Sequence, residues 1–250
     1  MGAGDMDVVP FLRRMCDEVE RSAGTYMPLL RKDVPAIPIP FFGKINSASV
    51  LTVGVNPSPG EFGGARIQYW ENISDTTHLA VRLTDYFNGT HHPWFDTWRK
   101  ALALLDVSYE KGRVAHVDLS PRATIPMAQV QDINLFLAMV RHDIKWFFEI
   151  LSELSSIKLV LLAGSVTKKH YINNFIKKSA SEHGYRFDGT AERTGKGRIG
   201  NYEFINNGKA FSCFYCSVSP SSRSRGLLIE RIGENSTRLK SLIHGTDSDV

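Results

Sequence analysis

Four segments of this 250-residue chain combine side chains that could bind a phosphate-bearing ligand. Each segment follows a short apolar run and holds hydroxyl, amide, carboxyl or basic groups, and three of the four contain proline. Converging backbone amides, hydroxyl groups and cations are what a phosphate group requires. The sequence therefore predicts a site for an anionic ligand, built from residues 54–62, 118–124, 164–169 and 219–226.

The apolar runs before these segments predict the scaffold that would bring them together. They are rich in β-branched and aromatic residues, which favours buried strands over 50–55, 113–118, 157–162 and 211–218. Helical stretches separate the runs, and strands separated by helices pair in parallel. We expect an α/β fold, a three-layer α/β/α domain around a central, mainly parallel four-stranded sheet, with ligands bound beyond the carboxyl ends of the strands.

Other patterns complete the predicted organisation. Apolar residues at helical spacing predict a helix over 8–19, and the longest helical stretch is 132–154. Residues 199–205, an Asn-Asn-Gly turn and the run from Ala210 predict a hairpin that feeds the last strand. We expect one domain over residues 1–250, with a core at 36–242 and an N-terminal helical extension at 1–35.

The composition is that of a folded chain. With 42% hydrophobic and 22% charged residues, it excludes a disordered tail and a collagen-like repeat. No run approaches about 18 apolar residues, so we expect no membrane span, and the first residues predict no secretory signal. Three cysteines, an odd and low count, indicate a reducing compartment. We expect an intracellular monomer in the cytoplasm (nucleoid) or the nucleus, and the net charge of +4 permits an anionic partner.

Two of the four segments resemble the signature motifs of the uracil-DNA glycosylase superfamily. Gly54-Val-Asn-Pro-Ser58 is similar to the Gly-x-Asn-Pro-Gly motif of the mismatch-specific and single-strand-selective branches. Ser219-Pro-Ser221 is similar to the second motif, in which His, Asn or Met precedes Pro-Ser. The lead-in at 39–43 and the strand order are also similar, so the resemblance covers residues 36–242.

The resemblance implies an enzyme that acts on single-stranded or duplex DNA without a cofactor. Such an enzyme flips a damaged or mismatched base, of the uracil type, out of the stack and hydrolyses its N-glycosidic bond. One alternative is a catalytically weakened or inactive DNA-binding member of the same fold. Another is a small-molecule α/β enzyme, such as a nucleoside or nucleotide hydrolase, that shares only the layout.

The resemblance also implies roles for three residues of the first motif segment. Asn56 matches the asparagine that positions the attacking water, and Val55 and Phe62 match positions that contact the base, Phe62 by stacking. The alternative for Asn56 is an Asx-type turn, and the alternative for Phe62 is a place in the core. Tyr69 and Trp70 are further candidates for stacking.

Two residues depart from the pattern of the superfamily. Asp118 stands in Asp118-Leu-Ser-Pro121 where the superfamily has an Asn that reads uracil, and an ionised carboxylate can only accept hydrogen bonds. We therefore expect either a protonated Asp118 or a substrate that presents donors, such as an amino-bearing pyrimidine; the alternative is a helix or turn cap. Ser219 stands where several branches have a catalytic His. It could donate one neutral hydrogen bond, and the alternative is that it is only a turn residue at the end of a strand.

The remaining candidates would bind the DNA backbone. Three serines match positions that bind DNA phosphates in the superfamily; they are Ser58, Ser165 and Ser221. Ser165 could instead be the N-cap of a helix. Arg223 and Arg225 fall in the loop that enters the duplex in the superfamily. Further cations could extend this DNA-facing stripe or be ordinary surface charge; they are Lys168, Lys169, Lys196, Arg198 and Arg231.

We expect no metal site. Cys213 and Cys216 have the spacing of a metal or redox pair, but residues three positions apart on a strand face opposite sides. Three cysteines cannot build the four-cysteine iron–sulfur cluster that some branches carry. His91-His92-Pro93 has no carboxylate at ligand spacing and is typical of a loop.

Overall fold

The computed structural model describes residues 5–31, 37–63, 66–89, 91–167, 170–194, 197–220 and 225–245. The chain divides into two compact units, each assembled from separate segments. The first unit comprises Met1–Asn46, Gly54–His92 and His116–Ser155. The second unit comprises Ser47–Val53, Pro93–Ala115 and Ser156–Val250. The single domain expected from the sequence stays a prediction.

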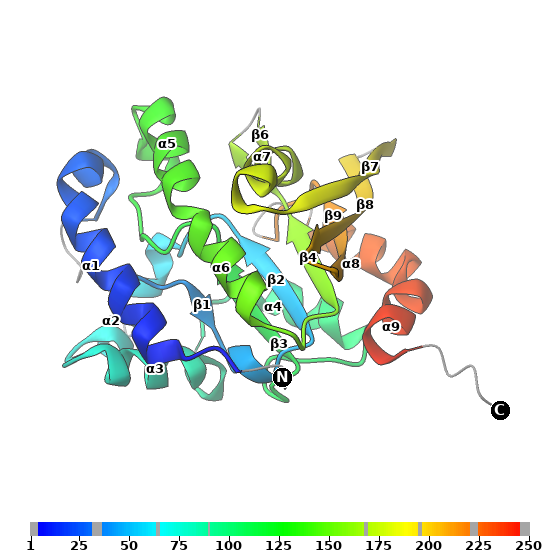
Figure 1. Cartoon of the computed structure of the whole chain (residues 1–250), viewed down its shortest axis with the longest axis horizontal. Coiled ribbons are helices and arrows are strands. Elements are labelled where there is room, and N and C mark those ends of the chain that lie inside the picture. The colour runs from blue at the N-terminus through cyan, green and yellow to red at the C-terminus, as the bar shows by residue number, and fades with distance from the viewer. Residues whose placement is uncertain are drawn as a thin grey trace. The chain divides into compact units, whose positions relative to one another are not determined.

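A mixed α/β fold is confirmed, with a sheet in the order β1-β3-β2-β4-β9-β8-β7 (Figure 1). Its strands are β1 (Phe41–Phe42), β2 (Val50–Gly54), β3 (Val114–Asp118), β4 (Leu159–Ala163), β7 (Arg186–Thr194), β8 (Gly197–Asn206) and β9 (Lys209–Cys216). Strand β4 pairs in parallel with β2 and with β9, whereas the pairs β1 with β3, β7 with β8, and β8 with β9 are antiparallel. The centre of the sheet is therefore parallel and its edges are antiparallel.

The four predicted strands are β2, β3, β4 and β9, but the count of four is wrong because the sheet has seven strands. The predicted runs are apolar because every residue of β2, β3 and β4 is buried. Strand β7 lacks such a run, since most of its residues are exposed. Strand β1 has only two residues, too few for an alternation to be recognised.

The described residues of the first unit form five helices besides β1 and the end of β3. They are α1 (Val8–Tyr26), α2 (Ile67–Trp70), α3 (Thr76–Thr84), α5 (Ile133–Asp143) and α6 (Lys145–Glu153). The predicted helix over 8–19 is confirmed within α1, which buries Phe11, Leu12, Met15 and Val19 and contacts α3 and α5 (Figure 1). The predicted stretch 132–154 is divided at Ile144 into α5 and α6.

The described residues of the second unit form four helices and the antiparallel strands β7, β8 and β9, which are coloured yellow to orange in Figure 1. The helices are α4 (Phe95–Ala103), α7 (Ile172–Ala180), α8 (Arg225–Glu234) and α9 (Ser236–His244), and a small hairpin pairs β5 (Ser165–Thr167) with β6 (His170–Tyr171). The predicted hairpin is confirmed as β8 and β9. Asn207 and Gly208 join these strands with φ of 48° and 80°, the left-handed conformation that a tight hairpin turn requires.

Short 3₁₀ helices occur between these elements; they are η1 (Met27–Leu29), η2 (Ile45–Ser47), η3 (Pro59–Phe62), η5 (Tyr86–Asn88), η6 (Met127–Gln129) and η7 (Ser181–His183). Within the described ranges, no helix has the length and apolar character needed to span a bilayer.

Candidate active site

The segments that follow β2 and β3 run side by side in the first unit. The backbone N–H of Leu119 donates to the Gly54 carbonyl at 3.1 Å, and that of Ser120 donates to the Val55 carbonyl at 2.9 Å. These bonds fix the start of the first motif segment against the segment that begins at Asp118. Two of the four segments expected to form the site are therefore neighbours.

Asn56 is held by its amide nitrogen. Its Nδ2 donates to Thr124 Oγ1 at 3.0 Å, to the Pro57 carbonyl at 3.2 Å and to the Arg122 carbonyl at 3.4 Å. Carbonyl oxygens can only accept, so the amide must direct its NH₂ group toward them. Among the described residues, Oδ1 has no hydrogen-bond partner, and the side chain is half-buried. Asn56 thus presents one acceptor in a fixed orientation.

The Asx-turn alternative for Asn56 finds no support in this geometry. In such a turn the side-chain oxygen accepts from the backbone N–H two residues on. No such bond occurs in the described part of the chain, where the bonds of the Asn56 side chain all come from Nδ2.

Asp118 is buried at the end of β3, with its residue only 3% exposed. Its Oδ1 lies 3.5 Å from His116 Nε2, while Oδ2 is buried without a hydrogen-bond partner among the described residues. Burial raises the pKa of Asp118, and the neighbouring His116 opposes that rise. The cap alternative is wrong, because in the described ranges no backbone N–H donates to this carboxyl group.

Gly54 lies directly against the Asp118 carboxyl group. A methyl group at Gly54 would lie 2.4 Å from Asp118 Oδ1 and 2.9 Å from His116 Nε2, far closer than van der Waals contact. The close approach of the backbone to these side chains therefore explains the glycine at the start of the motif.

We expect Gly54→Ala to lower the free energy of unfolding by about 1–3 kcal/mol, because the methyl group must displace a buried carboxyl and a buried imidazole. Urea unfolding would measure the change. The control is Gly24→Ala in α1, where nothing lies within 4 Å of the added methyl and the helix should gain about 0.5–1 kcal/mol. Equal effects of the two substitutions would contradict the close approach at Gly54.

Glu61, in the segment 54–62, is a buried carboxyl in addition to Asp118 and is not among the candidates predicted from the sequence. It is 2% exposed, and its Oε2 accepts from the Tyr86 hydroxyl at 2.6 Å. That hydroxyl in turn accepts from the backbone N–H of His92 at 2.9 Å. Burial raises the pKa of Glu61 to about 7, and the charge of Asp118 adds to the rise. The sequence does contain one sign of Glu61 as a candidate site residue, because it is the one acidic residue within 54–62.

Phe62 lies in the core, which was the alternative to its predicted role in stacking on the base. Its ring is 2% exposed and lies 6.0 Å, between ring centroids, from Trp70, which is itself buried. Tyr69 is half-buried, donates its hydroxyl hydrogen to the Arg82 carbonyl and lies under the Arg82 guanidinium. Stacking of a base on Phe62 stays a prediction, and it would require the ring to become exposed.

The other two candidates in the first motif segment are half-buried. Ser58 Oγ accepts from the Gly60 backbone N–H at 3.1 Å and so caps η3, while its hydroxyl hydrogen remains able to donate. Val55 is fixed through its carbonyl, which accepts from Ser120.

Arg122 differs from the expectation that the basic residues of these segments face an anionic ligand. It is 2% exposed, and its Nε and Nη2 donate to the two oxygens of Asp143 at 2.9 and 3.3 Å. Its Nη1 donates to the Val19 carbonyl in α1, and Ser120 Oγ donates to the same carboxylate. Arg122 therefore fixes the loop whose carbonyl and Thr124 hold Asn56.

The second unit contains Ser219, Ser165 and Arg225. Ser219 follows β9 and lies against Gly164, where a methyl group would be 3.4 Å from the Ser219 Cα and Cβ atoms. Ser165 begins β5 and α7 begins only at Ile172, so the N-cap alternative for Ser165 is wrong. Arg225 is the first residue of α8 and is exposed.

Several predicted DNA contacts lie outside the described residues; they are Ser221, Arg223, Lys168, Lys169 and Lys196. Two cations of the stripe already have neighbours. Arg231 Nη1 pairs with Glu234 Oε2 at 2.6 Å, and the Arg198 guanidinium lies 5.6 Å from the centroid of the Tyr171 ring. A continuous DNA-facing stripe stays a prediction.

The described ranges contain no cluster of three His, Cys, Asp or Glu side chains that could hold a metal ion. Cys213 and Cys216 are both buried free thiols of β9. Burial raises the pKa of each thiol. That environment suppresses the thiolate that metal ligation or nucleophilic attack requires.

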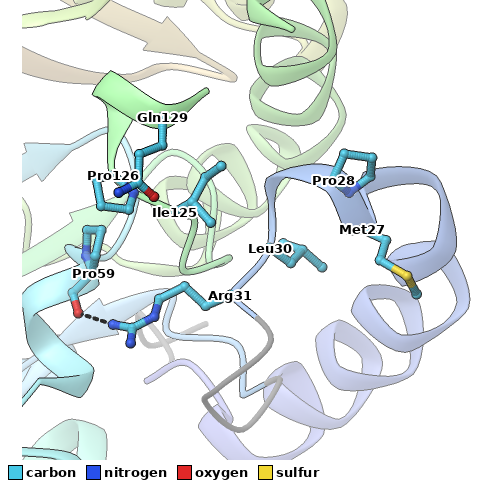
Figure 2. Close-up of a pocket in the computed structure, with 8 residues that line it drawn as sticks. All are labelled: Met27, Pro28, Leu30, Arg31, Pro59, Ile125, Pro126 and Gln129. Carbon is cyan, nitrogen blue, oxygen red and sulfur yellow. Dashed lines mark hydrogen bonds between the residues drawn. The ribbon is translucent and has the colours of Figure 1, made fainter. Parts of the chain in front are cut away.

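A cavity of about 510 Å³ adjoins the two segments that hold Asn56, within the first unit. It is lined by Met27, Pro28, Leu30, Arg31, Pro59, Ile125, Pro126 and Gln129 (Figure 2). Pro59 belongs to the first motif segment, and its carbonyl accepts from Arg31 Nη1 at 2.6 Å (Figure 2). The volume is typical of a small-molecule site, and the walls are mostly apolar.

No protein-family model matches the chain, and a search of curated proteins finds no match.

Proposed function

We propose that this chain is a monofunctional DNA glycosylase similar to the uracil-DNA glycosylase superfamily, with the three-layer fold of that superfamily and no cofactor. Its reaction is hydrolysis of the N-glycosidic bond of a flipped-out damaged or mismatched base. The observation that carries the proposal is the fixed amide of Asn56, whose NH₂ group is bound by acceptors and whose Oδ1 has no partner among the described residues.

This geometry suits a dissociative hydrolysis. The bond to the base breaks through an oxocarbenium-like transition state, so the attacking water needs orientation more than it needs a strong base. An amide oxygen accepts a hydrogen bond from water but is a poor base, and the hold on Nδ2 prevents Asn56 from presenting a donor instead. Asn56 would therefore align the water, and the leaving base would carry the negative charge.

The remaining roles follow from the motif resemblance. Ser219 would donate one neutral hydrogen bond to the leaving base. The DNA backbone would be bound by Ser58, Ser165, Ser221, Arg223 and Arg225 in an intracellular repair reaction. A neutral donor stabilises an anion less than an imidazolium does, so we expect slow turnover.

A second candidate is a DNA-binding member of the fold that has lost its activity. The burial of Phe62 favours it, because a base cannot stack on a ring that is 2% exposed. The free acceptor on Asn56 favours the enzyme, since a binding module has no use for a water-positioning group.

One assay separates these functions. The protein is incubated with single-stranded and duplex oligonucleotides that carry uracil, hypoxanthine, xanthine or mismatched thymine, and abasic sites are then cleaved with alkali. Strand scission on any lesion supports the glycosylase. Salt-sensitive binding without scission supports the binding module. A protein that shows neither strand scission nor DNA binding would contradict both proposals and favour a small-molecule enzyme.

A further inference from the structure

We propose that Ser58, Arg66 and His92 form a binding site for a phosphomonoester, such as the terminal phosphate of a DNA strand or of a free nucleotide. The motif resemblance gives no role to Arg66 or His92, and it assigns Ser58 only to the phosphodiester backbone of DNA. The inference goes beyond the proposed function and does not depend on the release of a base.

The three side chains meet at Gly60 within the first unit. Ser58 Oγ accepts from the Gly60 backbone N–H at 3.1 Å, and Arg66 Nε donates to the Gly60 carbonyl at 2.8 Å. A methyl group at Gly60 would lie 2.4 Å from His92 Nε2 and 3.4 Å from Ser58 Oγ. The imidazole and the hydroxyl group therefore lie on the same side of residue 60, and the absence of a side chain there lets them approach.

Each of the three side chains can donate a hydrogen bond to a ligand. The hydroxyl hydrogen of Ser58 has no acceptor among the described residues. Arg66 uses only Nε within the described ranges, so Nη1 and Nη2 keep their hydrogens for a ligand. The imidazole of His92 donates from one ring nitrogen when neutral and from both when charged. All three residues are half-buried, so a ligand can reach them.

The charges at this place favour an anionic ligand. Arg66 is positively charged at every accessible pH, and it forms no ion pair in the described part of the chain. Burial raises the pKa of Glu61 to about 7, although the Arg66 charge opposes the rise. The Glu61 carboxyl group is 2% exposed and accepts from Tyr86, so it faces the core. At pH 6 this carboxyl is therefore mostly neutral and leaves the Arg66 charge to a ligand.

The number of donor groups distinguishes a phosphomonoester from a phosphodiester. A phosphomonoester has three terminal oxygens and a charge of about −1.5 to −2 at pH 7. A phosphodiester within a strand has two such oxygens and one charge. Three donor side chains that meet at one residue can each bind one oxygen of a phosphomonoester, whereas a phosphodiester leaves one of them without an anionic oxygen.

Binding of thymine-only ligands tests the inference without any damaged base. Titration calorimetry at pH 6 would compare oligonucleotides that have a phosphate at the 5′ end, at the 3′ end or at neither, and thymidine monophosphates with thymidine. We expect a terminal phosphate to tighten binding about 10–100-fold, the range for hydrogen bonds to a charged group. A preference among the strands identifies a strand end as the source, and a preference among the nucleosides alone identifies a free nucleotide. Equal binding with and without the terminal phosphate in both sets overturns the inference.

Three variants test whether the site is the one at Gly60. Arg66→Ala and His92→Ala should each remove most of the preference for the terminal phosphate. Gly60→Ala keeps all three donor side chains, but its methyl group must displace the end of the His92 side chain, which is a small change for the fold. We expect Gly60→Ala to lose the preference as His92→Ala does.

Two matched controls should retain the preference. Gly63→Ala adds a methyl group to the same segment, where the nearest atom is the Gly60 carbonyl oxygen at 3.6 Å, an ordinary contact. Arg82→Ala removes another half-buried arginine of the first unit, which lies over Tyr69. A preference that survives in Arg66→Ala and in Gly60→Ala, or that the controls lose equally, would overturn the site.

Discussion

Asn56→Ala is expected to lower the single-turnover rate of base release by about 10²–10³-fold, the typical loss when one preorganised polar group of an active site is removed. The substitution removes the acceptor that would orient the attacking water and leaves the segments around it in place. Binding of the oligonucleotide should change little, because Asn56 would act on the water and not on the DNA backbone. Rapid-quench assays with the best substrate of the oligonucleotide panel would measure the rate.

Asn46→Ala is the matched control for Asn56→Ala. The Asn46 side chain also makes hydrogen bonds within the first unit, donating to the Met6 carbonyl and accepting from the Met6 N–H, both at 3.1 Å. Its loss should cost about 1–2 kcal/mol of stability but no activity in the folded protein. If both variants lost activity in proportion to their stability, Asn56 would have only a structural role.

The sequence predicts the centre of the sheet better than its edges for a physical reason. Strands β2 and β4 are buried throughout, so composition alone marks them. Strand β7 is mostly exposed, and its pairing with β8 depends on the hairpin rather than on an apolar run. The position of β7 at the edge depends on the arrangement of the whole sheet, and a local sequence pattern cannot predict it.

The candidate site was predicted where its chemistry is local and missed where it depends on distant partners. Asn56 is recognisable from the residues beside it. The burial of Glu61, in contrast, depends on Tyr86, which lies 25 positions away, and that of Arg122 depends on Asp143 and on the carbonyl of Val19, 21 and 103 positions away. An arginine in a polar segment is normally predicted to be exposed, because the local sequence does not reveal the distant residues that pair with it in the folded chain.

Arg122→Ala is expected to lower the free energy of unfolding by about 3–5 kcal/mol, because it leaves the Asp143 carboxylate buried and without its cation. The guanidinium also binds the Val19 carbonyl and Ser22 Oγ, so its removal separates α1 from the loop after β3. Urea unfolding of the purified variant would measure the change.

The control for Arg122→Ala is Arg14→Ala, which removes an exposed arginine–carboxylate pair, here between α1 and α6. Arg14 pairs with Glu149, but its side chain is 57% exposed, so we expect a loss of only about 0–1 kcal/mol. Arg122→Lys should fall between the two, since it keeps the charge and loses the planar two-point contact with Asp143. Because the Arg122 carbonyl and the adjacent Thr124 hold Asn56, Arg122→Lys should also slow base release in protein that remains folded. An unchanged rate in that variant would mean that Asn56 is positioned without the buried Arg122–Asp143 pair.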